Sequence, residues 1–174
     1  MQWLIEVSYK PKFFDAFGNT VKKDIEDLGV LGVKKVRTSQ LYHIEGDLKE
    51  KELRFLCQEL LTDNIVQQYK IRSSIVNHPP KKNKNAWIVE VWYKKGVTDA
   101  VADTVKKGMI DLGIQGINTV KTGYEYTIIG NISHQEIERI CKGLLANKVV
   151  QDYVVAEFTL PQKSRPRSTT TKNC

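Results

Sequence analysis

The chain has 174 residues, of which 41% are hydrophobic and 27% are charged, so its composition is that of a globular protein with a core. No apolar run approaches the roughly 18 residues of a membrane span, which argues against an integral membrane protein. The formal net charge of +7 comes almost entirely from residues 77–86 and 161–174, so neither half of the chain carries a basic groove for nucleic acid. We expect a cytoplasmic protein that does not bind a membrane.

An internal duplication organises the chain. With an offset of 84 residues, Trp3 aligns with Trp87, and the register continues without a gap to Tyr69 and Tyr153. About 27 of the 67 aligned positions are identical, which is far beyond chance. We predict repeat 1 over residues 1–76, a polar linker over 77–86, repeat 2 over 87–160, and a basic tail without regular structure over 161–174.

Each repeat is predicted to begin with a strand, because WLIEVSYK and WIVEVWYK alternate in polarity. The helix that follows is expected to begin at a capping carboxylate, Asp15 or Asp99, and to end at Gly29 or Gly113. Residues 33–45 and 117–129 are rich in β-branched and aromatic residues. They form either one long bent strand or two paired strands.

A second helix and a last strand complete each repeat. Ser133 and Glu136 predict a capping box in repeat 2, and Asp47 is expected to cap the equivalent helix in repeat 1. The step from Thr122 to Gly123 favours a turn or a bulge. The predicted fold class is α+β, with two tandem β-α-β-β-α-β units related to the ferredoxin-like fold, antiparallel sheets packed together and helices outside. One unit alone is too small to bury its apolar strand faces, so we expect each to complete the other.

Residues suited to catalysis are isolated. The alternation of the first strands predicts that Glu6 and Glu90 face solvent. Cys57 and Cys141 occupy matching apolar positions and are expected to be buried thiols. The histidines are expected to be lone surface residues, because no pair has the spacing of metal ligands: His43, His78 and His134. No phosphate-binding loop, dinucleotide fingerprint or nucleophile elbow occurs. We therefore predict no catalytic residue, no metal and no cofactor bound by this chain.

Three segments of repeat 2 carry a resemblance to a known family. KKGVTDAVADTVKKGMIDLG, VKTGYEYTIIG and LLANKVVQDY occur in this order, and the ordered set resembles the PurS family, the small subunit of phosphoribosylformylglycinamidine (FGAM) synthase. Repeat 1 departs from the pattern at residues 12–15 and at Ser39. Most chains of the family hold one copy, whereas this chain holds two.

The resemblance implies a non-catalytic subunit that acts in de novo purine biosynthesis. Such a subunit bridges a PurL-like synthetase, which uses ATP and magnesium, and a PurQ-like glutaminase, which releases ammonia. Positions that match the family pattern, together with a lysine pair on the first helix of repeat 2, are then candidates for partner contact: Gly96, Val97, Asp99, Lys106, Lys107, Lys121, Thr122, Gly123 and Asn147. Whether two chains form a homodimer stays open.

Two other functions stay open at this stage. The paired units resemble ACT-like regulatory modules, which hold a small metabolite between them. The basic linker and tail are compatible with RNA binding, which would depend steeply on salt.

Overall fold

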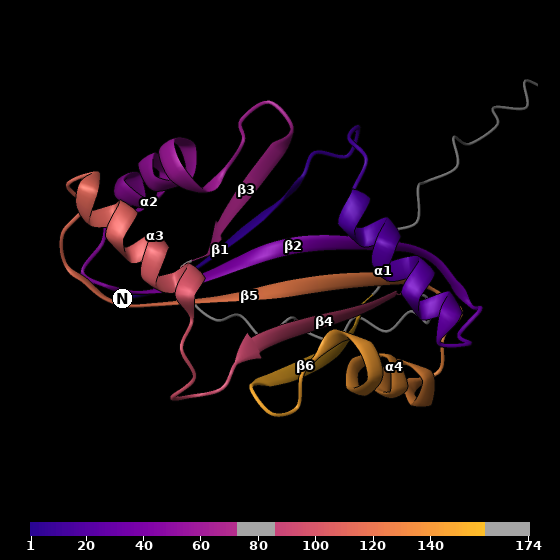
Figure 1. The fold of residues 1–174 in the computed structure, drawn as a ribbon. Helices are drawn as coiled ribbons and strands as arrows, with labels where there is room; N and C mark the ends of the chain where they lie inside the picture. The colour runs from indigo at the N-terminus through magenta and orange to yellow at the C-terminus, as the bar shows by residue number, and fades with distance from the viewer. Residues whose placement is uncertain (73–85, 159–174) are drawn as a thin grey trace, which may run out of the picture.

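The computed structural model describes residues 1–72 and 86–158 (Figure 1). The predicted tail and most of the predicted linker lie outside these residues. In chain order the elements are β1 (Gln2–Tyr9), α1 (Ala16–Asp27), β2 (Val33–Gly46), α2 (Glu50–Leu56), η1 (Cys57–Leu61), β3 (Gln67–Arg72), β4 (Ala86–Tyr93), α3 (Ala100–Asp111), β5 (Ile117–Gly130), α4 (His134–Ile140), η2 (Cys141–Leu145) and β6 (Gln151–Phe158). The elements η1 and η2 are π-helical turns that continue α2 and α4. None of the helices in the described part of the chain has the length and apolar character to cross a membrane.

Within residues 1–72 and 86–158, the strands form one antiparallel sheet of six strands in the order β3-β1-β2-β5-β4-β6. The α+β class and the two tandem repeats are confirmed, and the middle segment of each repeat is one long strand. The repeats meet edge to edge through β2 and β5, which differs from the expected stacking of two sheets. The turn predicted at Thr122 and Gly123 is wrong, because both residues lie within β5 and pair regularly with β2.

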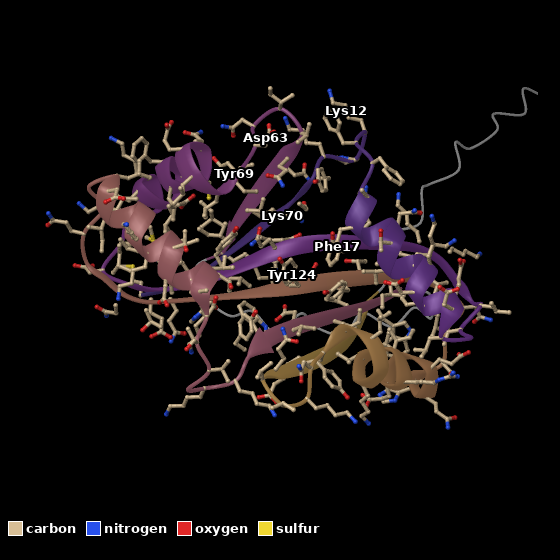
Figure 2. The ribbon with its side chains drawn as sticks, viewed as in Figure 1. Lys12, Phe17, Asp63, Tyr69, Lys70 and Tyr124 are labelled. Atoms are coloured by element: carbon tan, nitrogen blue, oxygen red, sulfur yellow. The ribbon has the colours of Figure 1, made fainter. Side chains whose placement is uncertain are left out.

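The pairing of β2 with β5 reveals a two-fold relation between the repeats. Gln40 pairs with Tyr124, the residue that occupies the same place in the second repeat, 84 positions later. Thr38 pairs with Tyr126 on one side of this point, and the equivalent pair lies on the other side. A pseudo-two-fold axis therefore passes between Gln40 and Tyr124. Tyr124 stands near the middle of the sheet, with its ring centroid 6.0 Å from that of Phe17 in α1 (Figure 2).

The first helix of each repeat packs on the sheet of the other repeat. One core joins α1 and α4 over β4 and β5, and α1 contributes Val21 and Ile25 to it. The second core joins α2 and α3 over β1 and β2, and α3 contributes Val105 and Met109. Figure 1 shows the same two helix pairs. Burial of each such side chain contributes about 1.5–3 kcal/mol, so each core is stabilised by residues from both repeats.

The ends of the second helices test the capping predictions. The Ser133 hydroxyl accepts from the Glu136 amide at 3.2 Å, and the Glu136 carboxylate accepts from the Ser133 amide at 2.8 Å, so the predicted capping box is confirmed. The prediction for Asp47 is wrong. Its amide donates to the Gly116 carbonyl at 2.9 Å across the central strand pair, and α2 begins only after Lys49, whose amide donates to the helix's own Glu52 carboxylate.

Glycines mark the helix ends and the seam between the repeats. Gly29 and Gly113 follow α1 and α3 with φ of 86° and 78°, as predicted. At the seam, a Cβ on Gly46 would lie 2.3 Å from the Gly116 carbonyl oxygen, and one on Gly130 would lie 2.2 Å from that of Gly32. Both distances are below any real contact, so the two ends of the β2–β5 pair admit only glycine.

Replacing Gly130 with alanine should destabilise the protein by about 1–3 kcal/mol, because the added methyl group meets backbone that cannot rotate away. Urea unfolding of Gly130→Ala against the unmodified chain measures this. Gly143→Ala in η2 is the matched control, since its Cβ would lie 3.7 Å from the nearest atom, in the Leu28 side chain. The control should be neutral or slightly stabilising. Equal effects of the two substitutions would contradict the tight seam.

Candidate functional site

Asp99 and Thr122, two of the predicted contact residues, join the start of α3 to β5. One Asp99 carboxylate oxygen accepts from the Ala102 amide at 2.9 Å, and the other accepts from the Thr122 amide at 2.7 Å. The Thr122 hydroxyl donates to the same carboxylate. Asp15 makes the same contacts in repeat 1, with Gly18 and Thr38. The capping predictions are confirmed, and both carboxylates also fasten a helix to the central strand pair.

Gly96, Val97 and Asn147 come together in a surface that we call the repeat-2 corner, formed by residues 93–98 and 146–150. The Lys94 amide donates to the Val150 carbonyl at 2.9 Å, which holds the two loops side by side. Asn147 accepts from the Val149 amide through its side chain at 3.0 Å and so shapes its own loop. Gly96 has φ of 86° with open space around it, so its backbone angle explains the glycine.

The other four candidates are dispersed. Gly123 leaves room for Trp92, because a Cβ there would lie 2.7 Å from the indole ring. Lys106 donates to the Asn118 carbonyl at 3.0 Å. Lys107 is exposed on α3, and Lys121 is exposed on β5. The structure thus groups three candidates at the corner and two at the start of α3, and it leaves these four apart.

Repeat 1 has the same corner, formed by residues 9–14 and 62–66. The Lys10 amide donates to the Val66 carbonyl at 2.9 Å, as Lys94 does to Val150 in repeat 2. Each corner ends in an exposed aliphatic residue: Ile65 is 76% exposed and Val149 is 80% exposed. Figure 2 shows Asp63 at the tip of the first corner. The sequence analysis did not select this pair, although the two residues lie in matching segments of the repeats, LLTDNIVQQY (60–69) and LLANKVVQDY (144–153).

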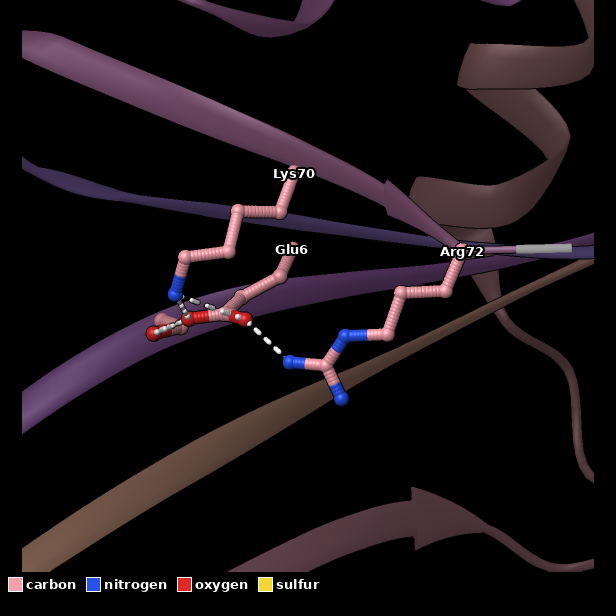
Figure 3. Close-up of polar contacts among 4 residues, drawn as sticks. Glu6, Lys70 and Arg72 are labelled. Carbon is pink, nitrogen blue, oxygen red and sulfur yellow. Dashed lines mark hydrogen bonds and ion pairs between the residues drawn. The ribbon is translucent and has the colours of Figure 1, made fainter. Parts of the chain in front are cut away.

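The face of the sheet opposite the four helices carries buried carboxylates. Glu6 is 6% exposed, so the prediction that it faces solvent is wrong. Its carboxylate lies 2.7 Å from the Arg72 guanidinium and 3.4 Å from the Lys70 ammonium, and the Ser39 hydroxyl donates to it at 3.3 Å. Figure 3 shows both cations directed at the carboxylate. The strand alternation was read correctly, but neighbouring β3 supplies the charges that permit burial.

Glu125 lies beside this cluster on β5, paired with Ser39 of β2 and with Glu90 of β4. Burial raises the pKa of its carboxyl group to about 7, and the negative charges of Glu6 and Glu90 add to the increase. The cations of β3 oppose it. The Glu125 carboxyl group therefore titrates near neutral pH.

Two cysteines and one histidine are buried in the described part of the chain. Cys57 and Cys141 are buried, as predicted, and burial raises the pKa of each thiol to about 12. His43 is buried in β2, so its predicted surface position is wrong; burial lowers the pKa of its imidazole. In the described parts of the chain, no group of three or more His, Cys, Asp or Glu residues is placed to hold a metal ion. His78 and Cys174 fall outside these parts.

Comparison with known proteins identifies related sequences for both repeats. The family profile described as PurS, phosphoribosylformylglycinamidine (FGAM) synthase, matches residues 2–74 and again residues 86–157. The phosphoribosylformylglycinamidine synthase subunit PurS of Thermotoga maritima is 29% identical over 76 residues, which cover 41% of this chain and 93% of that protein. The relative thus corresponds in length to a single repeat.

Replacement of either anchoring carboxylate should destabilise the protein strongly. We expect Asp15→Ala and Asp99→Ala each to cost about 2–4 kcal/mol, since each removes a helix cap and leaves buried donors unpaired. Asp111→Ala on exposed α3 is the control and should stay within about 0.5 kcal/mol. Chemical denaturation of the three variants compares them. If Asp99→Ala lowers stability as little as Asp111→Ala does, the carboxylate of Asp99 does not anchor the helix and is available for another role.

Glu125→Gln should change how stability depends on pH. The pKa of this carboxyl group is higher in the folded chain than in the unfolded chain, so it stabilises the fold fully at low pH. That contribution is lost as pH rises from about 4.5 through 7. Relative to the unmodified chain, the variant should gain stability between pH 5 and pH 8, by on the order of 3 kcal/mol at most. Melting curves at both pH values test this, and a constant difference would contradict it.

Proposed function

The chain belongs to the PurS family, and on this premise we propose that it is a non-catalytic subunit of FGAM synthase in de novo purine biosynthesis. In this role it bridges the ATP-dependent synthetase subunit and the glutaminase subunit. The observation that carries the proposal is the match of the family to both repeats, residues 2–74 and 86–157. The relative from Thermotoga maritima, whose printed name is that of a synthase subunit, supports the same role.

The positions of the two corners support a bridge. The corners precede β3 and β6, which are the outermost strands on opposite edges of the sheet. Ile65 and Val149 project from them as exposed aliphatic side chains. Burial of such residues against partner proteins is favourable, and their separation lets two partners bind at the same time. The pairing of β2 with β5 joins the two repeats, and α1 and α3 each pack on strands of the other repeat. The sheet between the two corners is therefore one packed unit.

We further propose that the bridge holds the glutaminase and the synthetase together, so that ammonia passes between their sites. Asp99 and Lys106, two of the titratable residues at the predicted contact positions, form hydrogen bonds inside this chain. ATP and magnesium are accordingly assigned to the synthetase partner, and this chain supplies surfaces for binding proteins.

Reconstitution tests the bridging role. A mixture of synthetase, glutaminase and this chain should form amidine from glutamine, and omission of this chain should reduce that activity by at least tenfold. Ammonia-dependent synthesis by the synthetase alone should be unaffected. Size-exclusion chromatography of the three proteins, with and without glutamine and ADP, reports the complex. Full glutamine-dependent activity without this chain would remove the proposal.

The corner residues give a sharper test. Ile65→Glu and Val149→Glu should each weaken complex formation by about tenfold or more, because each buries a charge against a partner. Neither should change the melting temperature, since both side chains are exposed. Leu31→Glu is the matched control: Leu31 is 82% exposed, follows the end of α1 opposite to the first corner, and has Gln115 as its counterpart. A comparable loss with Leu31→Glu would remove the corners from the proposed interface.

A further inference from the structure

A cationic cleft distinguishes the two repeats, and most of the residues that line it belong to repeat 1. The cleft has a volume of about 630 Å³ and lies beside the first half of β2, where β1 has ended. Among the described residues, six basic side chains line it: Lys22, Lys34, Lys35, Arg37, Lys70 and Arg72. Their counterparts in repeat 2 are Lys106, Asn118, Thr119, Lys121, Val154 and Ala156, of which only two are basic. The duplication therefore preserves the scaffold but not this charge.

Among the described residues that line the cleft, basic side chains outnumber acidic ones. Three acidic residues of the described ranges line the cleft. Glu6 is paired with Lys70 and Arg72, and Asp15 accepts from backbone amides. Glu125 is the third. Lys34, Lys35 and Arg37 form no ion pair with any residue in the described ranges. A row of cations along one strand, without ion-pair partners among the described residues, attracts an anion into the cleft.

The shape of the cleft favours a small ligand over a peptide strand. The free edge of β2 is occupied where a strand would add: the Thr38 amide donates to Asp15 at 2.7 Å. The start of α1 also presses on this edge, since a Cβ on Gly18 would lie 2.7 Å from the Val36 carbonyl oxygen. A volume of about 630 Å³ is typical of small-molecule sites, about 300–1,000 Å³.

The rim of the cleft supplies apolar surface. Tyr9, Phe13 and Phe14 line it on the side of the loop before α1. Ile88 and Ile129 from repeat 2 line the opposite side, so the cleft spans both repeats. Cations beside aromatic rings suit a ligand that joins a phosphate to a planar ring.

We propose that this cleft binds a small phosphorylated metabolite, with the phosphate against Lys35 and Arg37 and the ring system against the aromatic rim. The site is separate from the two corners and does not depend on the proposed bridging role. Its occupancy is a property of the isolated chain, so failure of one proposal leaves the other standing.

Calorimetric titration of the full chain with AMP, inorganic pyrophosphate and adenosine at low salt tests the site. We expect one site for AMP and for pyrophosphate, and no binding of adenosine, which lacks the phosphate. Absence of binding by both anions at millimolar concentration would overturn the proposal. Equal binding of adenosine and AMP would overturn it too, as would binding of a glutamate-rich peptide without binding of AMP.

Paired variants decide where the anion binds. Lys35→Thr with Arg37→Gln should weaken AMP binding by about tenfold or more, since charge-assisted contacts are lost. Lys107→Thr with Lys121→Gln removes the same net charge from exposed positions of repeat 2 and should change affinity less than about twofold. All four side chains are exposed, so melting temperatures should stay unchanged. Equal weakening by both pairs would mean that general charge attraction explains the binding, and the site would be rejected.

Discussion

The backbone pairing of β2 with β5 is the contact on which the rest of the structure depends. It turns two three-stranded sheets into one sheet of six and sets the axis between the repeats. Because β1 pairs only with residues 39–45 of β2, the first half of β2 extends beyond its own sheet. The helix α1 packs there, beside α4 and above the strands of repeat 2. The exchange of helices, the two mixed cores and the glycines at both seam ends follow from this overlap.

Features set by neighbours in sequence could be predicted, and features set by pairing between strands could not. The alternation of polar and apolar residues predicted the first strand of each repeat, and the capping box of Ser133 and Glu136 predicted the start of a helix. Both signals depend on residues only a few positions apart. Glu6 and His43 were placed at the surface for want of information about the adjacent strands. The glycine at 123 suggested a turn, but the cause is the indole of Trp92 on the neighbouring strand.

The candidate site was predicted in part, for a related reason. Comparison of the repeats by identity selects residues that maintain the fold, such as Asp99 and Thr122, which contact each other. The cleft residues were missed because they differ between the repeats: Lys70 and Arg72 correspond to Val154 and Ala156. A comparison of charge at equivalent positions would have marked them. In a duplicated chain, positions that are identical in both repeats maintain the shared fold, and positions that differ indicate what one repeat does alone.

The residues on the axis have a consequence for how such a chain can evolve. In a pair of identical subunits, every substitution appears twice, and a residue on the two-fold axis must face its own copy. Covalent fusion removes that restriction. At the centre of this sheet an amide, Gln40, stands opposite a phenol, Tyr124, whose ring lies near Phe17. In a symmetric pair of identical subunits, the two residues that meet on the axis must be the same, whereas in this chain they differ, so one half can change without altering the other.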